Sequence, residues 1–157
     1  MTTSNTYCPN TNPVQVLRDA ADYLEANGWT RDEFFTPKYR IVVCGGEPEA
    51  FFTDEPPAAC ALGGIQIAVT GEPVDVFANG FNVTPATDRQ FKAVLHATEL
   101  VVDHLRREHN TAGLGSLSKV VALARWNDRN GRTAAEVISA MRDAAETYER
   151  SHGEVIP

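Results

Sequence analysis

A long, nearly uncharged run of residues extends from Pro56 to Val69 and gives the clearest hydrophobic pattern in the chain. Apolar residues recur in it at helical spacing, and the side opposite to this stripe is apolar as well. A helix that is apolar all round is a buried helix. The proline pair before it predicts its start, and Gly71 predicts its end. Gly63 and Gly64 lower the helix propensity at its centre, so we expect another backbone to pack against them.

Two more helices are predicted by their capping residues. Asn12 followed by Pro13 is typical of a helix start, and apolar residues at spacings of three and four follow as far as Gly28. Thr133 with Glu136 three residues later forms a capping box, which predicts the start of the last helix. The expected buried positions of this last helix are Ala134, Val137, Ile138, Met141, Ala145 and Tyr148.

The longest helix is predicted between about Asp88 and Glu108, after a capping box of Thr87 and Gln90. Its apolar stripe keeps spacings of three and four throughout, and we expect it to lie in the main core. The stripe consists of Phe91, Val94, Leu95, Thr98, Val101, Val102 and Leu105. A shorter helix is predicted after Ser116, with a stripe made of Leu117, Val120, Val121 and Ala124.

The clearest strand pattern is the run of residues 39–44 (Tyr-Arg-Ile-Val-Val-Cys), which ends at a glycine pair. Residues 49–53 are suitable as its hairpin partner. They contain Phe51 and Phe52 and are surrounded by the carboxylates of Glu47, Glu49, Asp54 and Glu55. Exposed aromatic residues flanked by charge are typical of an interface that docks a partner. A hairpin whose phenylalanines fold back onto the core would give the same pattern.

These elements predict a mainly α fold with about five helices and a possible small β-hairpin. A chain of 157 residues is the size of one domain and can bury a substantial core. We therefore expect a single helical domain over residues 13–152, preceded by a disordered N-terminal tail over residues 1–12.

The charge balance argues against a nucleic-acid partner. The formal net charge is −7, and the basic residues are scattered, with Arg106 and Arg107 as the only adjacent pair. Phosphate binding needs clustered Lys and Arg. No apolar run is long enough to span a bilayer, and the start of the sequence lacks the pattern of a secretory signal. These features predict a cytoplasmic protein without a membrane partner.

Three cysteines, Cys8, Cys44 and Cys60, are widely spaced and include no Cys-x-x-Cys pair. A structural zinc site is therefore not expected, and neither is another metal or a cofactor.

Cys60 has two interpretations. Near a helix N-terminus its thiol could have a lowered pKa, as a nucleophile requires. A thiol enzyme would also need a histidine within hydrogen-bond reach. Among the four histidines only His104 flanks an apolar stripe and could turn inward, with Asn127 or Asp128 in support. The alternative is that Cys60 is a small buried packing residue.

Asn127 and Asp128 are the most informative polar residues, because the predicted helix carries them round onto its own apolar stripe. A buried amide and a buried carboxylate need hydrogen-bond partners. We interpret them as a structural pair that ties the end of their helix to the free N–H groups at the start of the Cys60 helix. A ligand site or a catalytic site at this position is the alternative.

Four stretches carry distinctive motifs: Ala20–Leu24 in the first helix, Ala59–Gly64 with its Cys-Ala-Leu-Gly helix start, Ala124–Asp128 with its Trp-Asn-Asp helix end, and Gly131–Val137 with its Gly-Arg-Thr capping turn. Together they resemble a family of small uncharacterised proteins of actinobacteria and their phages. The likeness covers about two thirds of the chain. The family has no established activity, so the resemblance implies a fold and an origin and implies nothing about chemistry.

We predict from these features a protein that acts by binding rather than by catalysis. The expectation is an intracellular accessory factor of an actinobacterium or a phage, whose partner is a second copy or a host protein. One alternative is a thiol-dependent enzyme that uses Cys60. Another is a small-molecule binding protein with a polar pocket near Asp128.

Overall fold

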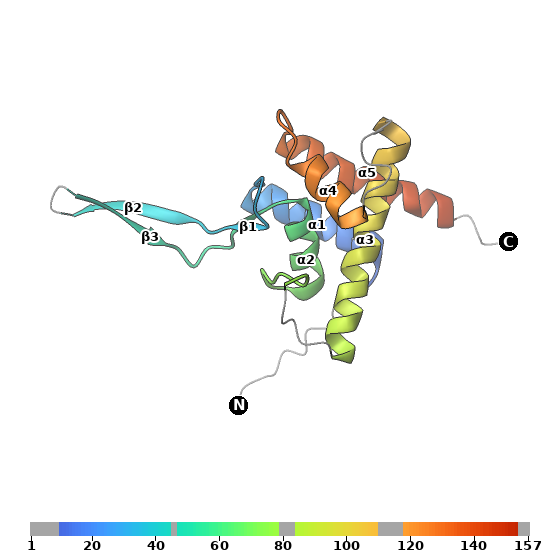
Figure 1. Cartoon of the computed structure of the whole chain (residues 1–157), viewed down its shortest axis with the longest axis horizontal. Coiled ribbons are helices and arrows are strands. Elements are labelled where there is room, and N and C mark those ends of the chain that lie inside the picture. Colours follow the sequence, from blue (N-terminus) through green and yellow to red (C-terminus); the bar gives the residue numbers. More distant parts are fainter. Residues whose placement is uncertain (1–9, 45–46, 79–83, 110–117, 154–157) are drawn as a thin grey trace.

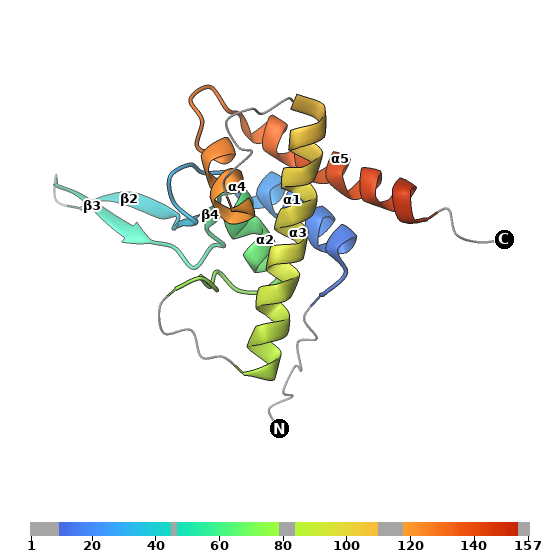
Figure 2. The same cartoon turned by 45° about the vertical axis from the view of Figure 1, so that its right-hand side comes forward.

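Five helices pack into one body, and a two-stranded ribbon projects from it (Figure 1). The computed structural model describes residues 10–44, 47–78, 84–109 and 118–153. The helices are α1 (Pro13–Asn27), α2 (Ala61–Thr70), α3 (Pro85–His109), α4 (Lys119–Asn127) and α5 (Ala134–His152). A turned view shows the long α3 crossing the body in front of α1 and α2 (Figure 2). The predicted mainly α fold with five helices and a small hairpin is confirmed.

Four short strands form two separate antiparallel pairs. β2 (Tyr39–Cys44) pairs with β3 (Glu47–Phe52), which confirms the predicted hairpin. The ladder runs as far as the pair of Cys44 with Glu47, so β3 begins two residues earlier than expected. We call β2 and β3 the arm.

The base of the arm is a strand pair that the sequence did not predict. β1 (Phe35–Thr36) pairs with β4 (Ala58–Ala59) where the chain leaves the helical body and returns to it. Among the described residues, neither strand of the arm packs broadly on a helix. The arm is therefore joined to the body through its base.

Helix α2 is the buried centre of the body, and it packs against α1, α3 and α4. All of its residues from Ala61 to Ile67 are buried. A methyl group on Gly63 would overlap the carbonyl oxygen of Phe34, and one on Gly64 would lie 3.3 Å from the side chain of Leu24. The expected close approach to both glycines is confirmed.

The start of α2 differs from the prediction. The proline pair does not open the helix, because the two residues after it form β4 and Cys60 is the N-cap. The amide of Ala59 donates to the carbonyl of Gly28, and that of Cys60 donates to the carbonyl of Phe34. These bonds to an earlier loop hold the chain extended, and α2 begins only at Ala61. Its predicted end at Gly71 is confirmed.

Helix α3 begins at Pro85, three residues before the expected start. The carbonyl of Thr84 accepts the amide of Asp88, and the hydroxyl of Thr84 accepts that of Thr87 at 3.2 Å. The residue expected to be the cap, Thr87, therefore lies in the first turn.

The stripe of α3 lies in the core, with two exceptions. The fully enclosed members are Val94, Thr98, Val101, Val102 and Leu105. Phe91 is partly buried against Phe77, with 5.5 Å between their ring centroids. The prediction for Leu95 is wrong, because it lies at the edge of the stripe and stays partly exposed.

Helix α4 begins at Lys119 with Ser118 as its N-cap. Ser116, the expected cap, and Leu117 lie outside the described residues. The predicted stripe of this helix is wrong. Its buried face consists of Ala122, Leu123, Trp126 and Asn127, and the side chain of Val121 is 41% exposed. The bulky Leu123 and Trp126 face the core in place of the expected stripe.

Helices α1 and α5 pack along each other on the far side of α2. The cap at Asn12 and the capping box at Thr133 are confirmed. In α5 the predicted Val137, Met141 and Ala145 are buried, whereas Ala134, Ile138 and Tyr148 are partly exposed. Residues 1–9 of the expected tail lie outside the described residues, and the amide of Asn10 donates to the carboxylate of Asp19.

Candidate functional site

Asn127, the last residue of α4, joins three parts of the chain. Its side chain is 1% exposed. Its Oδ1 accepts hydrogen bonds from the backbone amide of Ala61 at 3.0 Å and from the indole Nε1 of Trp29 at 2.8 Å. Its Nδ2 donates to the carbonyl of Thr30 at 3.3 Å and to Oδ1 of Asp128 at 2.8 Å. The primary amide thus uses both acceptor positions and both donors.

The contact with Ala61 is the one expected from the sequence, because Ala61 is the first residue of α2. The first N–H groups of a helix have no partner within it and carry the positive end of its dipole. Asn127 satisfies one of these donors in a buried position. It also fixes the Trp29–Thr30 segment, which links α1 to the base of the arm. We call this arrangement the Asn127 junction.

Asp128 lies on the solvent side of the junction. The sequence interpretation of a buried carboxylate is wrong, since this side chain is only partly buried. Its Oδ1 accepts the amide of Asp32 at 3.0 Å as well as the bond from Asn127. The backbone of Asp32 is left-handed, with φ of 64°, and only a few residue types adopt that conformation readily. Asp128 therefore holds a tight bend in the segment that precedes the arm.

Cys60 caps α2 and is 6% exposed. Its Sγ accepts the amide of Gly63 at 3.3 Å. Burial raises the pKa of the Cys60 thiol from its usual 9.0 to about 11, and the charge of Asp128 adds to this effect. The hydrogen bonds from the backbone act in the opposite direction and are outweighed. The thiol is thus protonated at neutral pH, which makes it a poor nucleophile.

A hollow of about 250 Å³ lies beside the thiol, and its lining includes Cys60, Asp128, Asp32, Glu33, Phe34 and Ala124. This is the position at which the sequence placed a small-molecule pocket. Among the described residues, the lining offers carboxylates and apolar surface but no basic group. A ligand here would have to be small and uncharged or cationic.

His104 turns inward from α3, as the sequence allowed, and is 6% exposed. It lines a different hollow of about 430 Å³, together with Trp126 and residues of the α4–α5 turn and of α5. The described residues that line the two hollows are different. The amide of Asn127 is fully engaged elsewhere. The structure therefore does not bring Cys60, His104 and Asn127 together as a catalytic group.

Phe51 and Phe52 are the last two residues of β3 and lie next to the base of the arm. Their side chains are 51% and 78% exposed. They do not fold back onto the core, so of the two sequence interpretations the exposed one describes the structure. Asp54 and Glu55 follow directly and are exposed as well.

Sequence reasoning missed Trp29 at the junction and, outside it, Arg132 in the turn before α5. Trp29 lies in a stretch without a clean period, so no pattern indicated a partner for its indole N–H. Arg132 stacks on Trp126, with its guanidinium carbon 4.1 Å from the ring centroid, and donates from Nε to the carbonyl of that residue. A basic residue just before a capping box was the available signal for this contact.

Metal binding and membrane insertion can be checked in the described part of the chain. No group of three or more His, Cys, Asp and Glu side chains within residues 10–44, 47–78, 84–109 and 118–153 could hold a metal ion. Over the same ranges, no helix has both the length and the apolar character needed to cross a membrane.

Comparison with known proteins gives one result. Searches of curated proteins and of solved structures found no match. The match to a protein family covers residues 8–147, which include the arm, its base and the Asn127 junction. The chain therefore belongs to the family described as "Family of unknown function (DUF6197)".

Proposed function

We propose that the protein acts by binding another protein and that the arm bears the contact surface. The observation that carries this proposal is the exposure of Phe52 and Phe51 on a ribbon that extends away from the helical body (Figure 1). Aromatic residues are enriched at protein interfaces, and hot spots are often aromatic. The resemblance of its motifs to actinobacterial and phage proteins suggests an accessory factor, which we propose acts inside the cell.

The energetics of the arm support this proposal. A single two-stranded hairpin is at best marginally stable in water, and it becomes stable by packing on another surface. In the described part of the chain, the two strands of the arm pair with each other and neither packs broadly on a helix. Two neighbouring phenylalanines that are more than half exposed leave apolar surface in contact with water. A protein partner that covers them would stabilise both the ribbon and the complex.

The geometry supports binding better than thiol catalysis. The Cys60 thiol is buried, accepts a hydrogen bond from Gly63 and has a raised pKa. His104 lines a different hollow. Nucleophilic cysteines need a partly exposed and electropositive environment, which this site lacks.

Substitutions at Phe52 test the proposal. Phe52→Ser removes the apolar side chain, and Phe52→Leu is the matched control that keeps most of it. The immobilised protein is exposed to an actinobacterial lysate, and self-association is measured in parallel by sedimentation velocity. We expect the wild type and Phe52→Leu to bind a protein, either themselves or another chain, and Phe52→Ser to lose roughly tenfold or more in affinity. If neither self-association nor capture depends on Phe52, the arm is not a binding surface and the proposal is wrong.

A further inference from the structure

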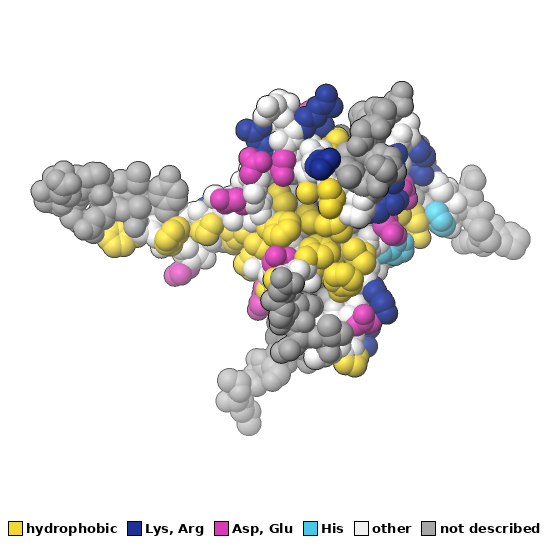
Figure 3. Space-filling model, in the orientation of Figure 1, with side chains coloured by type: hydrophobic (Ala, Val, Ile, Leu, Met, Phe, Trp, Pro, Cys, Tyr) yellow, Lys and Arg dark blue, Asp and Glu magenta, His cyan; other side chains and the backbone are white. Residues whose placement is uncertain are grey.

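The end of β3 and the residues directly after it, 51–55, combine exposed aromatic rings with negative charge. Phe51 and Phe52 are followed within three residues by Asp54 and Glu55, and all four side chains are exposed. Glu55 lies 3.9 Å from Lys38, which leaves a long and exposed ion pair of small energetic value. Hydrophobic atoms continue from this segment along the base of the arm (Figure 3). We call residues 51–55 the acidic-aromatic segment.

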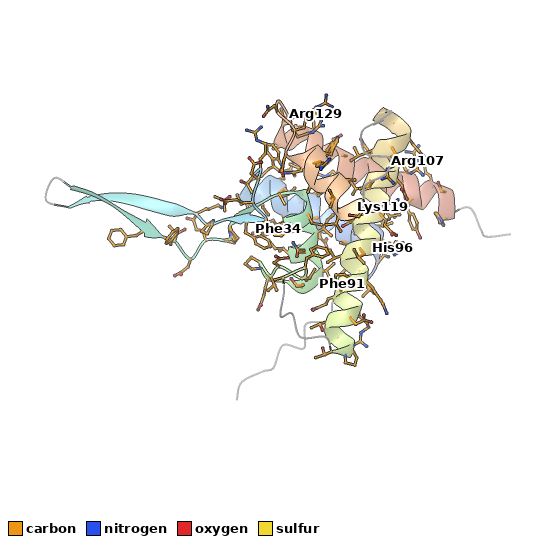
Figure 4. The ribbon with its side chains drawn as sticks, in the orientation of Figure 1. Phe34, Phe91, His96, Arg107, Lys119 and Arg129 are labelled. Atoms are coloured by element: carbon orange, nitrogen blue, oxygen red, sulfur yellow. The ribbon has the colours of Figure 1, made fainter. Side chains whose placement is uncertain are left out.

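The outer face of α4 has the opposite charge. Val121 is 41% exposed, and Arg125 is exposed four residues later, so the two lie on the same face of the helix. Arg129 is exposed beyond the end of α4, at the outer edge of the body (Figure 4). Basic side chains lie beside hydrophobic ones over this helix (Figure 3). We call Val121, Arg125 and Arg129 the basic face.

Within the described residues, the side chains of the two arginines of the basic face, Arg125 and Arg129, form no ion pair. Lys119 at the start of the same helix is different, because it pairs with Asp103 on α3. The chain as a whole carries a net charge of −7. A free basic surface on an acidic protein is the place where another copy of that protein can approach without repulsion.

We infer that the acidic-aromatic segment of one copy docks on the basic face of a second copy. Phe52 would cover Val121, and Asp54 and Glu55 would lie opposite Arg125 and Arg129. The arm projects from the helical body (Figures 1 and 2), and the contact that we infer is made between copies. This inference rests on the proposed function and names the partner. Each copy carries one arm and one basic face. When each arm docks on the basic face of the other copy across a two-fold axis, both contacts are occupied and the assembly stops at two copies.

Paired charge reversals test this contact. The arm variant is Asp54→Lys with Glu55→Lys, and the face variant is Arg125→Glu with Arg129→Glu. All four positions are exposed, and thermal melts followed by circular dichroism check that both variants fold. In sedimentation velocity over a wide concentration range, we expect the wild type to form dimers and each variant alone to associate roughly tenfold or more weakly. An equimolar mixture of the two variants should form dimers again, because both of its contacts then pair opposite charges.

Three results would overturn the inference: a wild type that stays monomeric, a mixture that associates no better than the separate variants, or assemblies that keep growing beyond two copies. These results are distinguishable from failure of the proposed function. If the wild type is monomeric but Phe52-dependent capture of another protein remains, the second copy is not the partner and the arm is still a binding surface.

Discussion

The Asn127 junction and the arm are neighbours in the structure, yet they are built in opposite ways. At the junction a buried amide makes four hydrogen bonds to Ala61, Trp29, Thr30 and Asp128. In the arm the described residues of two strands bond to each other, and the side chains of Phe51 and Phe52 are exposed. A fully paired buried polar group fixes one arrangement of the chain, because any other leaves a donor unpaired. An exposed ribbon has no such restriction and is available for contact with another molecule.

The difference also shows how one region depends on the other. The chain leaves the body after Thr30 and returns at Ala59, and the amide of Thr30 donates to the carbonyl of Ala59 at 3.0 Å. The carbonyl of the same Thr30 accepts the amide of Asn127. The direction in which the arm leaves the body is therefore set at the junction. Changes at the junction should alter the stability of the fold, whereas changes in the arm should alter association alone.

The largest effect is expected beside the junction, at Gly63. A methyl group there would overlap the backbone carbonyl of Phe34, which cannot move without breaking the bond from Cys60. Gly63→Ala should lower the free energy of unfolding by about 4 kcal/mol or prevent folding, since overpacking against backbone has no cheap relief. Gly64→Ala is the adjacent control. Its new methyl meets the side chain of Leu24 at 3.3 Å, so we expect a loss of about 1 kcal/mol or less in urea melts. Equal losses at both positions would contradict this account.

Removal of the amide at the centre of the junction should have the next largest effect. Asn127→Ala leaves the amide of Ala61 and the indole N–H of Trp29 without their acceptor, and we expect a loss of about 3 kcal/mol. Asp128→Ala should cost only about 1 kcal/mol, because this carboxylate is partly exposed and water can replace it. Asn130→Ala, at an exposed turn position, is the control. An Asn127→Ala midpoint in urea equal to that of the control would show that the junction does not stabilise the fold.

The sequence was sufficient to predict those helices whose capping residues and hydrophobic periodicity agree. At Asn12 and Thr133 the capping residues are local, and a short-range signal predicts a short-range structure. The prediction of where α2 begins was wrong for the opposite reason. It is decided by hydrogen bonds from Ala59 and Cys60 to residues more than twenty positions earlier, and no local pattern encodes them. The prediction of the buried face of α4 was wrong because Val121 and Leu123 are both apolar, and only tertiary packing decides which of them is buried.

The candidate site could be predicted only in part. Asn127 was identifiable as an amide near an apolar stripe, and its contact with the start of α2 follows from the unpaired N–H groups that every helix start presents. The partner Trp29 was not identifiable, because it is ninety-eight positions away and lies in a loop. The exposure of Phe52 was left open by the sequence. A hairpin on the core and a hairpin in solvent can have the same residues, and the difference lies in the base formed by β1 and β4.

A pH titration should distinguish the buried thiol at the edge of the junction from an exposed one. Because burial raises the pKa of Cys60 from 9.0 to about 11, the folded state holds this proton more tightly than the unfolded state does. The resulting stabilisation is fully present below pH 9 and is lost as the pH rises through 11. The loss should reach about 2 kcal/mol by pH 11.

Cys60→Ser is the matched variant for this titration, because serine keeps an N-cap acceptor and does not ionise in this range. The quantity to compare is the change in unfolding free energy between pH 8 and pH 11, measured by urea melts of both proteins. Between these two pH values, the free energy of unfolding should fall by about 2 kcal/mol more in the wild type than in the variant. Parallel curves for the two proteins would mean that the thiol is as accessible folded as unfolded, and a reactive Cys60 would become the better interpretation.

The smallest effect on the free energy of unfolding is expected in the arm. A small effect there is the result that distinguishes an exposed arm from one that packs on its own body. Phe52→Ser should change the free energy of unfolding by less than about 0.5 kcal/mol, because a side chain that is 78% exposed contributes little packing to its own chain. Phe34→Ser is the control, since this side chain is partly buried against the core and its loss should cost more than about 1 kcal/mol. Both values come from urea melts at a concentration below that of self-association. A loss at Phe52 as large as that at Phe34 would show that the arm packs on its own body, and the contrast between a stabilising junction and a binding arm would then fail.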